Sequence, residues 1–303
     1  MKNEAFLGRA VLAVAAIGFG LYLAYGTPAA APGAPAATTG NGAPRAVTFY
    51  CGAGNTMQAV FATSSVALAL SDGRQYALPQ ARSASGIRYE ATSTGPDIRF
   101  SGKGDFGALT DSASTTDTRY ANCTAAHVSA SGTPGYDTYE NSGRTFSFTF
   151  PTSFDVVGID PDYGPGWSAP ATTTGEVLAK IAVPQSFEPG TNFGDAWFTV
   201  GTSADPRAVA DCTKSLSGTE AASAPVTIGE VTYAKLEFTG VGAGNIYDTT
   251  SYRTVKDGQC YAIEYTIHYA NILNYPAGKV RRFDEQKAAT ALDEVARSFR
   301  FLR

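Results

Sequence analysis

The segment Ser83–Tyr89 holds side chains well suited to hydrogen-bond another molecule. Ser83 and Ser85 precede Gly86, and a glycine readily adopts the positive φ that a tight turn requires. Such a turn directs the serine hydroxyls outward, where each can donate and accept hydrogen bonds. Tyr89 follows as a rigid amphipathic side chain that can support the turn. The chemistry expected of this segment is recognition by hydrogen bonding.

Lys103 is the second candidate, and it stands between Gly102 and Gly104. Because neither neighbour has a side chain, the lysine projects alone, and a flexible ammonium of this kind can enter a deep acidic cleft. The spacing alone favours a simpler interpretation, a glycine-punctuated hairpin with an ordinary surface lysine. Further features are needed to decide between the two.

Residues that could support catalysis are few. The chain has two histidines, His127 in a predicted loop and His268 at a predicted solvent-facing strand position, and no G-x-S-x-G motif. The glycine-rich run 240–245 is not followed by a predicted helix, as a nucleotide loop requires, and is predicted to be a hairpin. Residues 160–164 have two carboxylates at calcium-loop spacing but no downstream glutamate, so we expect a surface turn. The sequence predicts a protein that is not an enzyme, with no cofactor and no metal.

The composition indicates a folded protein that does not bind nucleic acid as its main partner. Of the 303 residues, 44% are hydrophobic and 12% aromatic, which is ample for packed cores. The net charge of -4 disfavours a phosphate backbone, which needs a basic face. Residues 46–125 carry no net charge and the following residues carry -6, so attraction for a cationic partner would come from the C-terminal part.

The four cysteines fall into two pairs. Cys51 and Cys123 bracket one candidate domain, and Cys212 and Cys260 lie inside a second. No C-x-x-C spacing occurs, which disfavours a metal site or a thioredoxin-type motif. In an exported protein the natural interpretation is two disulfides, one within each domain.

The N-terminus has the pattern of an export signal. Lys2 and Arg9 precede a nearly uninterrupted apolar run from Ala10 to Tyr25, close to the length of a membrane-spanning helix. The positive flank favours a cytoplasmic N-terminus. We expect residues 1–26 to be an uncleaved anchor in the inner membrane of a bacterial envelope, with the remainder on the periplasmic side; a cleaved signal peptide is the alternative.

The rest of the chain divides by pattern into a tether and two domains. Residues 27–45 form a Pro/Ala-rich tether. Residues 46–125 contain seven or eight short alternating strands, with Asp72-Gly73 as a hairpin signal, which predicts a small antiparallel β-barrel or sandwich. Residues 126–137 are predicted to be a second linker. Residues 138–303 are predicted to be an α+β domain with an antiparallel sheet.

Two helices are expected in the C-terminal domain. Asp205-Pro206 supplies a cap and a first-turn proline for one. The segment Lys279–Phe299 has apolar residues along one stripe and predicts the other.

The segment Phe49–Cys123, about a quarter of the chain, resembles the family of membrane-bound inhibitors of c-type lysozyme (MliC-like). No single motif is specific, but several occur in the expected order. They are Cys51, Tyr76, Leu78-Pro79, the S-x-S-G-x-x-Y loop at Ser83–Tyr89, the F-x-x-K-G strand at Phe100–Gly104, Leu109, and the closing Tyr-x-x-Cys at Tyr120–Cys123.

The resemblance implies a partner and a role for each candidate residue. In that family a serine-glycine loop and a strand lysine enter the lysozyme cleft and contact its two catalytic carboxylates. Carried over, Ser85 would hydrogen-bond the catalytic acid, and Lys103 would pair with a carboxylate. Gly86 would permit the close approach, Tyr89 would hold or extend the loop, and Ser83 belongs to the same loop.

Two positions depart from the family pattern. Members tend to have an aromatic residue where this chain has Ser101 and an alanine where it has Gly107. The resemblance therefore implies a looser lysine strand in this chain.

The C-terminal half resembles PsbP-like domains over fewer features. These are the aromatic strand Phe146–Pro151, the hairpin from Tyr252 to Tyr261 and the ending Ser298–Phe301. Domains of that fold mostly act as accessory or binding modules. The sequence therefore predicts an envelope inhibitor of c-type lysozyme; the alternative is an envelope interaction module whose C-terminal domain binds a protein or a glycan.

Overall fold

Strands dominate the structure, which is a computed structural model. It describes residues 44–91, 97–112, 117–159, 166–170, 175–214 and 225–302. The expected anchor at 1–26, nearly all of the tether at 27–45 and the turn at 160–164 lie outside these residues. Within the described ranges, no helix is long and apolar enough to cross a membrane.

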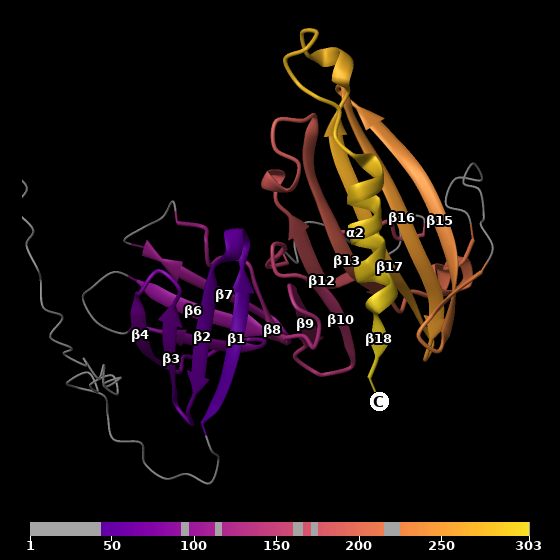
Figure 1. The fold of residues 1–303 in the computed structure, drawn as a ribbon. Helices are drawn as coiled ribbons and strands as arrows, with labels where there is room; N and C mark the ends of the chain where they lie inside the picture. Colours follow the sequence, from indigo (N-terminus) through magenta and orange to yellow (C-terminus); the bar gives the residue numbers. More distant parts are fainter. Residues whose placement is uncertain are drawn as a thin grey trace, which may run out of the picture. The chain divides into compact units, whose positions relative to one another are not determined.

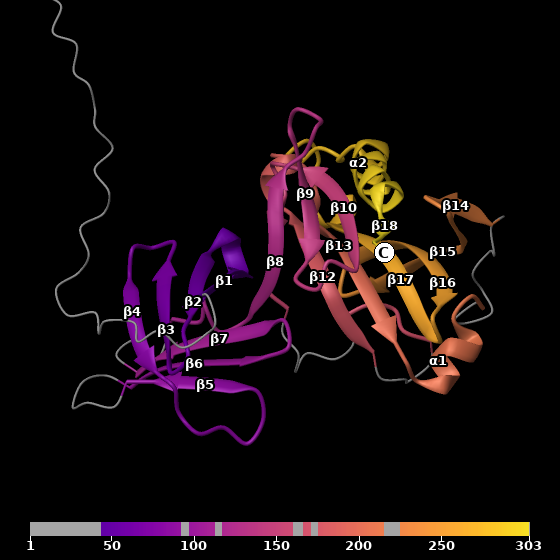
Figure 2. The ribbon, with the colours of Figure 1, turned by 90° about the horizontal axis from the view of Figure 1, so that it is seen from below.

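The N-terminal half is an antiparallel meander with neighbours in the order β4-β3-β2-β1-β8-β7-β6-β5 (Figures 1 and 2). Its strands are β1 (Arg45–Cys51), β2 (Thr56–Phe61), β3 (Ser65–Leu70), β4 (Gln75–Pro79), β5 (Ile87–Glu90), β6 (Ile98–Lys103), β7 (Phe106–Asp111) and β8 (Cys123–Ala130). The predicted alternation is realised in β3, where Val66, Leu68 and Leu70 are buried. Gly73 has φ +91° in the predicted hairpin between β3 and β4.

The predicted closed barrel does not form. Strands β4 and β5 would have to pair along their length to close it. Only an isolated bridge between Gln80 and Tyr89, with a hydrogen bond of 2.8 Å from Ala81 N to Arg88 O, joins them. Because the polar segment 81–86 separates these short strands, the ladder stays open here.

The segment expected to be a linker at 126–137 is largely strand. β8 continues to Ala130, and its second half pairs with β9 (Tyr136–Asn141), so that Ala126 lies opposite Asn141. The sheet then runs through β10 (Phe146–Pro151) to β18 (Arg300–Phe301). Figure 2 shows β8 continuing from the N-terminal strands to β9. Since Thr39–Arg303 is one compact unit, the two-domain layout is not confirmed.

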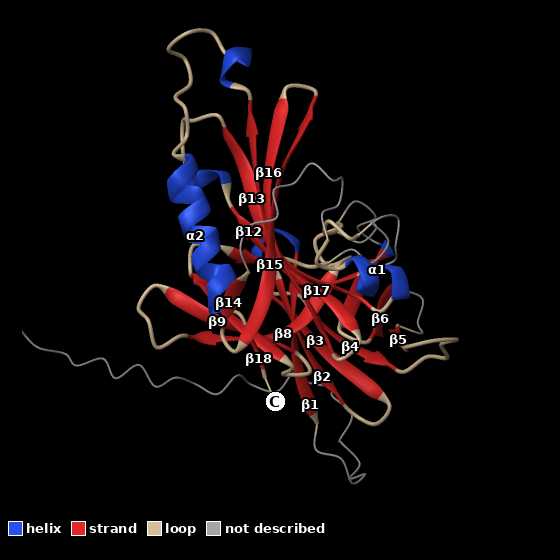
Figure 3. Cartoon of the chain, turned by 90° about the vertical axis from the view of Figure 1, so that its right-hand side faces the viewer, coloured by secondary structure: helices blue, strands red, loops and turns tan. Residues whose placement is uncertain are grey.

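The C-terminal half adds a second antiparallel sheet, in the order β11-β12-β13-β17-β16-β15-β14 (Figure 3). Its strands are β11 (Asp155–Val156), β12 (Glu176–Val183), β13 (Phe193–Ser203), β14 (Val226–Ile228), β15 (Val231–Gly242), β16 (Asn245–Lys256) and β17 (Gln259–Ala270). The glycine-rich run 240–245 forms the β15–β16 hairpin, as predicted.

Both expected helices are present, and the second is shorter than expected. Helix α1 (Pro206–Asp211) begins after Asp205, whose carboxylate accepts a hydrogen bond from Arg207 N. Helix α2 (Glu285–Ser298) begins six residues later than expected, because Asp284 caps it by accepting from Lys287 N at 2.9 Å. The apolar stripe of α2, including Leu292 and Val295, is buried against β10, β13 and β17.

Two disulfides join the cysteines in the predicted pairs. Cys51 pairs with Cys123, and Cys212 with Cys260. Cys51 and Cys123 are also direct partners in the β1–β8 ladder. Both bonds are buried.

Candidate functional site

Lys103 occupies the tip of the β6–β7 hairpin. It lies opposite Phe106, and Gly104 and Asp105 form the turn between them. Gly104 has φ +59°, a conformation that a side chain would strain. Lys103 is exposed and makes no ion pair with any described residue. The hairpin thus presents an ammonium without a described counter-ion.

The serine loop lies directly beside this hairpin. Gly86 has φ +70°, and a Cβ added there would lie 2.2 Å from Gly102 O and 3.3 Å from the Cβ of Lys103. Only a glycine allows the loop to approach β6 this closely. Within the loop, the Ser83 hydroxyl donates to Ser85 O at 2.6 Å. The structure therefore brings together the two stretches that the sequence singled out.

Ser83, Ser85 and Lys103 line one hollow of about 330 Å³. Its floor is formed by β6 and β7, and Ser101 of β6 also lines it. Ser83, Ser85 and Gly86 are all exposed. Serine residues and a lysine therefore line the same hollow.

Tyr89 differs from the other candidates because it is buried. It lies on β5 with 5% of its surface exposed, and its ring centroid is 5.9 Å from that of Phe61 and 6.3 Å from that of Phe100. Burial also raises the pKa of its hydroxyl. Tyr89 anchors β5 from within the core, and its side chain is not available to a partner.

The lysine strand is firmly held, contrary to the expectation from Ser101 and Gly107. The β6–β7 ladder pairs without interruption from Ile98 to Lys103. A Cβ on Gly107 would lie 2.7 Å from the Phe49 ring, which packs edge-on against Phe100. The Phe49 ring therefore fills the space that an alanine side chain at position 107 would need. The glycine at 107 is compensated by this packing and does not loosen the lysine strand.

Contacts from the C-terminal half support the other side of the hairpin. The Ser142 hydroxyl donates to the Asp105 carboxylate. Within the N-terminal half, Ala125 N also donates to Asp105 O at 2.7 Å. Lys103 also lines a second hollow, of about 600 Å³, together with Glu176 and Leu178 of β12. Ser142 follows Asp105 by 37 residues, and no sequence signal indicated their contact.

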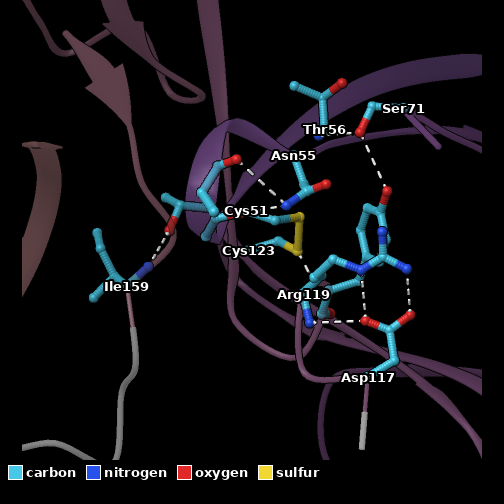
Figure 4. The surroundings of a disulfide bond; sticks show 12 residues. Cys51, Asn55, Thr56, Ser71, Asp117, Arg119, Cys123 and Ile159 are labelled. Carbon is cyan, nitrogen blue, oxygen red and sulfur yellow. Dashed lines mark hydrogen bonds and ion pairs between the residues drawn. A yellow bond between two sulfur atoms is a disulfide. The ribbon is translucent and has the colours of Figure 1, made fainter. Parts of the chain in front are cut away.

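The disulfide Cys51–Cys123 closes the base of this region (Figure 4). Next to Cys123, the Thr124 hydroxyl oxygen accepts from Ile159 N at 3.1 Å. Just after the end of β1, the Asn55 side chain donates to Gly52 O at 2.6 Å. The bond and its neighbours fix where β8 leaves β1.

An ion-pair network holds the segment that precedes Cys123. Asp117 pairs with Arg119 at 2.8 Å and with Arg74 at 2.7 Å, and Arg74 also pairs with Asp72. The two arginines hold the pKa of the Asp117 carboxyl well below its usual range, and Arg74 lowers the pKa of Asp72. Both guanidinium groups also lie over the ring of Tyr120.

The histidines lie away from this region. His127 is exposed on β8 and not in a loop. His268 has Nδ1 3.0 Å from an Asp195 oxygen and Nε2 3.1 Å from the side-chain oxygen of Asn245, and it stacks on Tyr247 at 4.5 Å. The cross-strand register supplies this acidic partner, which the sequence did not reveal.

Both ring nitrogens of His268 contact side-chain oxygens, and no contact of its ring with a serine or cysteine occurs among the described residues. In the described part of the chain, no group of three His, Cys, Asp or Glu residues could hold a metal ion.

The fold and the site together define a disulfide-linked antiparallel β-module that presents a lysine beside a serine loop. Residues 49–118 match the family model for the membrane-bound lysozyme-inhibitor of c-type lysozyme, MliC. The match includes the serine loop and Lys103, and it confirms the resemblance of the N-terminal half. It is a family of inhibitors and not of enzymes. The resemblance of the C-terminal half to PsbP-like domains stays a prediction.

No curated protein matches the chain. One solved structure, a crystal structure from Bacteroides thetaiotaomicron VPI-5482 at 1.50 Å resolution, is similar at 12% identity with a TM-score of 0.32. The similarity covers 55% of this chain and 48% of that one, so the chain spans about half the length of that structure.

Proposed function

We propose that the chain is a cell-envelope inhibitor of c-type lysozyme, in which Ser85 and Lys103 enter the active-site cleft. The proposal rests on the family match over residues 49–118 and on one geometric observation. The serine loop approaches the lysine strand closely at Gly86, and Ser85 and Lys103 line one hollow, which supports their presentation to a single partner.

This pair of groups suits the chemistry of a glycosidase. Such an enzyme uses two carboxyl groups at a fixed separation, one as acid and the other as nucleophile or base. The Lys103 ammonium pairs with an ionised carboxylate, and the Ser85 hydroxyl donates to or accepts from the other. Both carboxyl groups are then occupied, and the substrate is excluded. Lys103 has no ion pair with a described residue, so it loses only its hydration, and no ion pair within the described structure, when it contacts the carboxylate.

Attachment and organisation complete the proposal. Residues 1–26 anchor the chain in the inner membrane, and residues 27–45 carry the inhibitory module away from it on the periplasmic side. The module is residues 46–125, and residues 138–303 support it. The rival function is an interaction module in which the N-terminal half is only a scaffold.

Inhibition of cell-wall lysis by a c-type lysozyme tests the proposal directly. The purified full chain is expected to inhibit, and Lys103→Ala to raise the inhibition constant by at least ~30-fold, because losing one partner of a desolvated charge pair costs about 2–5 kcal/mol. Ser85→Ala removes a hydrogen bond to a charged group and is expected to cost about tenfold or more. Lys214→Ala is the control, since Lys214 is an exposed lysine of the C-terminal half. Unchanged lysozyme activity at high concentrations of the full chain would instead favour the interaction module.

A further inference from the structure

The two most exposed large hydrophobic side chains among the described residues lie on one tip of the C-terminal half. Leu273 is 86% exposed and Val241 is 79% exposed, and Tyr275 is also exposed. Val241 is near the end of β15, and Leu273 lies in η4 (Ile272–Asn274), the short turn after β17. We call residues 241–246 and 271–279 the apolar tip. In Figures 1 and 3 its two segments lie together at the top of the view.

Hydrogen bonds between the two segments give the tip a fixed shape. The Asn274 side chain donates to Gly244 O at 2.9 Å, and Asn271 N donates to the same oxygen at 2.8 Å. Gly244 has φ +80°, and a Cβ there would lie 2.5 Å from the Asn274 nitrogen. Leu273 is therefore exposed on a hydrogen-bonded turn and not on a frayed loop.

The segment that carries Leu273 is positively charged, although the chain as a whole is acidic. The acidic residues just outside the tip are Asp248, which accepts from Tyr269 and Thr239, Asp284, which caps α2, and Glu285. Residues 271–283 include Lys279, Arg281 and Arg282 but no acidic residue, in a chain of net charge -4. Arg282 pairs with Glu285 just beyond, at 3.4 Å. Arg281 donates to the backbone oxygen of Pro189, and neither it nor Lys279 makes an ion pair with another described residue. These two cations remain to balance an external negative charge.

Protruding aliphatic residues, an exposed tyrosine and adjacent cations match the chemistry of an anionic lipid surface. We propose that the apolar tip inserts into the headgroup region of an anionic bilayer. Leu273 and Val241 reach the acyl boundary, and Lys279 and Arg281 lie at the lipid phosphates. Two or three apolar side chains bind a bilayer only weakly on their own. The contact therefore acts together with a second attachment of the chain to the membrane. This membrane contact is separate from lysozyme inhibition.

Fluorescence quenching in vesicles tests the proposal on the full chain. Leu273→Trp and, as the matched control, Val60→Trp are reconstituted in vesicles of brominated phosphatidylglycerol and phosphatidylcholine. Val60 is also an exposed apolar residue, on β2 and far from the tip in the sequence. Because the chain already holds Trp167 and Trp197, the emission of the added tryptophan is the difference between each variant and the unsubstituted chain. This difference is expected to be mostly quenched in Leu273→Trp and little quenched in Val60→Trp. Combining Leu273→Trp with Lys279→Gln and Arg281→Gln is expected to restore much of the signal.

Several results would overturn the proposal. They are equal quenching in the two variants, no quenching in either, or quenching that ignores the loss of both cations. A measurement without vesicles tests whether a second copy of the chain, instead of a bilayer, covers the apolar tip. If the added tryptophan in Leu273→Trp becomes shielded from acrylamide as protein concentration rises, a second copy of the chain covers the tip. Because no lysozyme is present, these outcomes are independent of the inhibitory function.

Discussion

Replacing Gly86 with alanine changes the contact that joins the serine loop to the lysine strand. The new Cβ would lie 2.2 Å from Gly102 O, so the loop has to retreat by more than ~1 Å to reach ordinary contact. The positive φ of Gly86 adds about 1–2 kcal/mol for a residue with a side chain. With about 1–2 kcal/mol for incomplete relaxation of the overlap, we expect a loss of about 2–4 kcal/mol in the free energy of unfolding.

Inhibition should fall for a separate reason. Once the loop has retreated, Ser85 and Lys103 no longer reach two carboxylates at a fixed separation, and losing one charge-assisted hydrogen bond costs about 1.5–3 kcal/mol, or about 10–150-fold in the inhibition constant. Denaturant unfolding and inhibition of cell-wall lysis measure the two effects.

Gly104→Ala provides the matched control for Gly86→Ala. Gly104 also has positive φ but no atom within 4 Å of an added Cβ, so it carries the conformational cost alone. We expect it to lose only about 1–2 kcal/mol. If Gly86→Ala and Gly104→Ala lose equal stability, the close approach of loop and strand does not matter. If Gly86→Ala inhibits as well as the unsubstituted chain, the paired presentation of Ser85 and Lys103 is wrong.

Three further predictions concern the frame around the site. Ser142→Ala removes the hydrogen bond to the Asp105 carboxylate and should lower the free energy of unfolding by about 1–2 kcal/mol and weaken inhibition several-fold in the lysis assay; an unchanged inhibition constant would show that the bond does not position the hairpin. Gly107→Ala, which restores the family residue, should destabilise by about 1–3 kcal/mol in denaturant unfolding because Phe49 already fills the space, and a neutral result would refute that packing. Since the pKa of Asp117 is lowered in the folded state, its stabilisation is present above about pH 4 and is lost as the pH falls below that, so Asp117→Asn should flatten the decline in melting temperature between about pH 4 and pH 2.

Local features of the fold could be predicted because short-range chemistry decides them. Asp72-Gly73 makes a hairpin and Asp205-Pro206 starts a helix wherever they occur between suitable flanks. The disulfide pairs followed from the grouping of the cysteines. Whether the strands close into a barrel could not be predicted, because alternation predicts that a strand exists but not which strand lies beside it.

The candidate site divides in the same way. Exposure of Lys103 could be predicted from its flanking glycines. Its contact with the Gly86 loop is a matter of register between β5 and β6, and the family resemblance alone implied it. Burial of Tyr89 follows from the aromatic cluster with Phe61 and Phe100, which only the packed sheet assembles. Asp105 and Ser142 carry no local pattern at all, because polar residues in turns are common in any sequence.

The shared strand β8 bears on how the inhibitory module should be studied. A fragment ending at residue 125 would cut β8 after its pairing with β1 and remove the strand β9 that covers its second half. The cut leaves the Asp105 carboxylate without Ser142, and it exposes the side of Phe106 that packs beside Ile159 and Val177. Each loss acts on the hairpin that presents Lys103. The C-terminal half is therefore part of what orients the lysine, and a weak result from the fragment alone would not count against inhibition by the full chain.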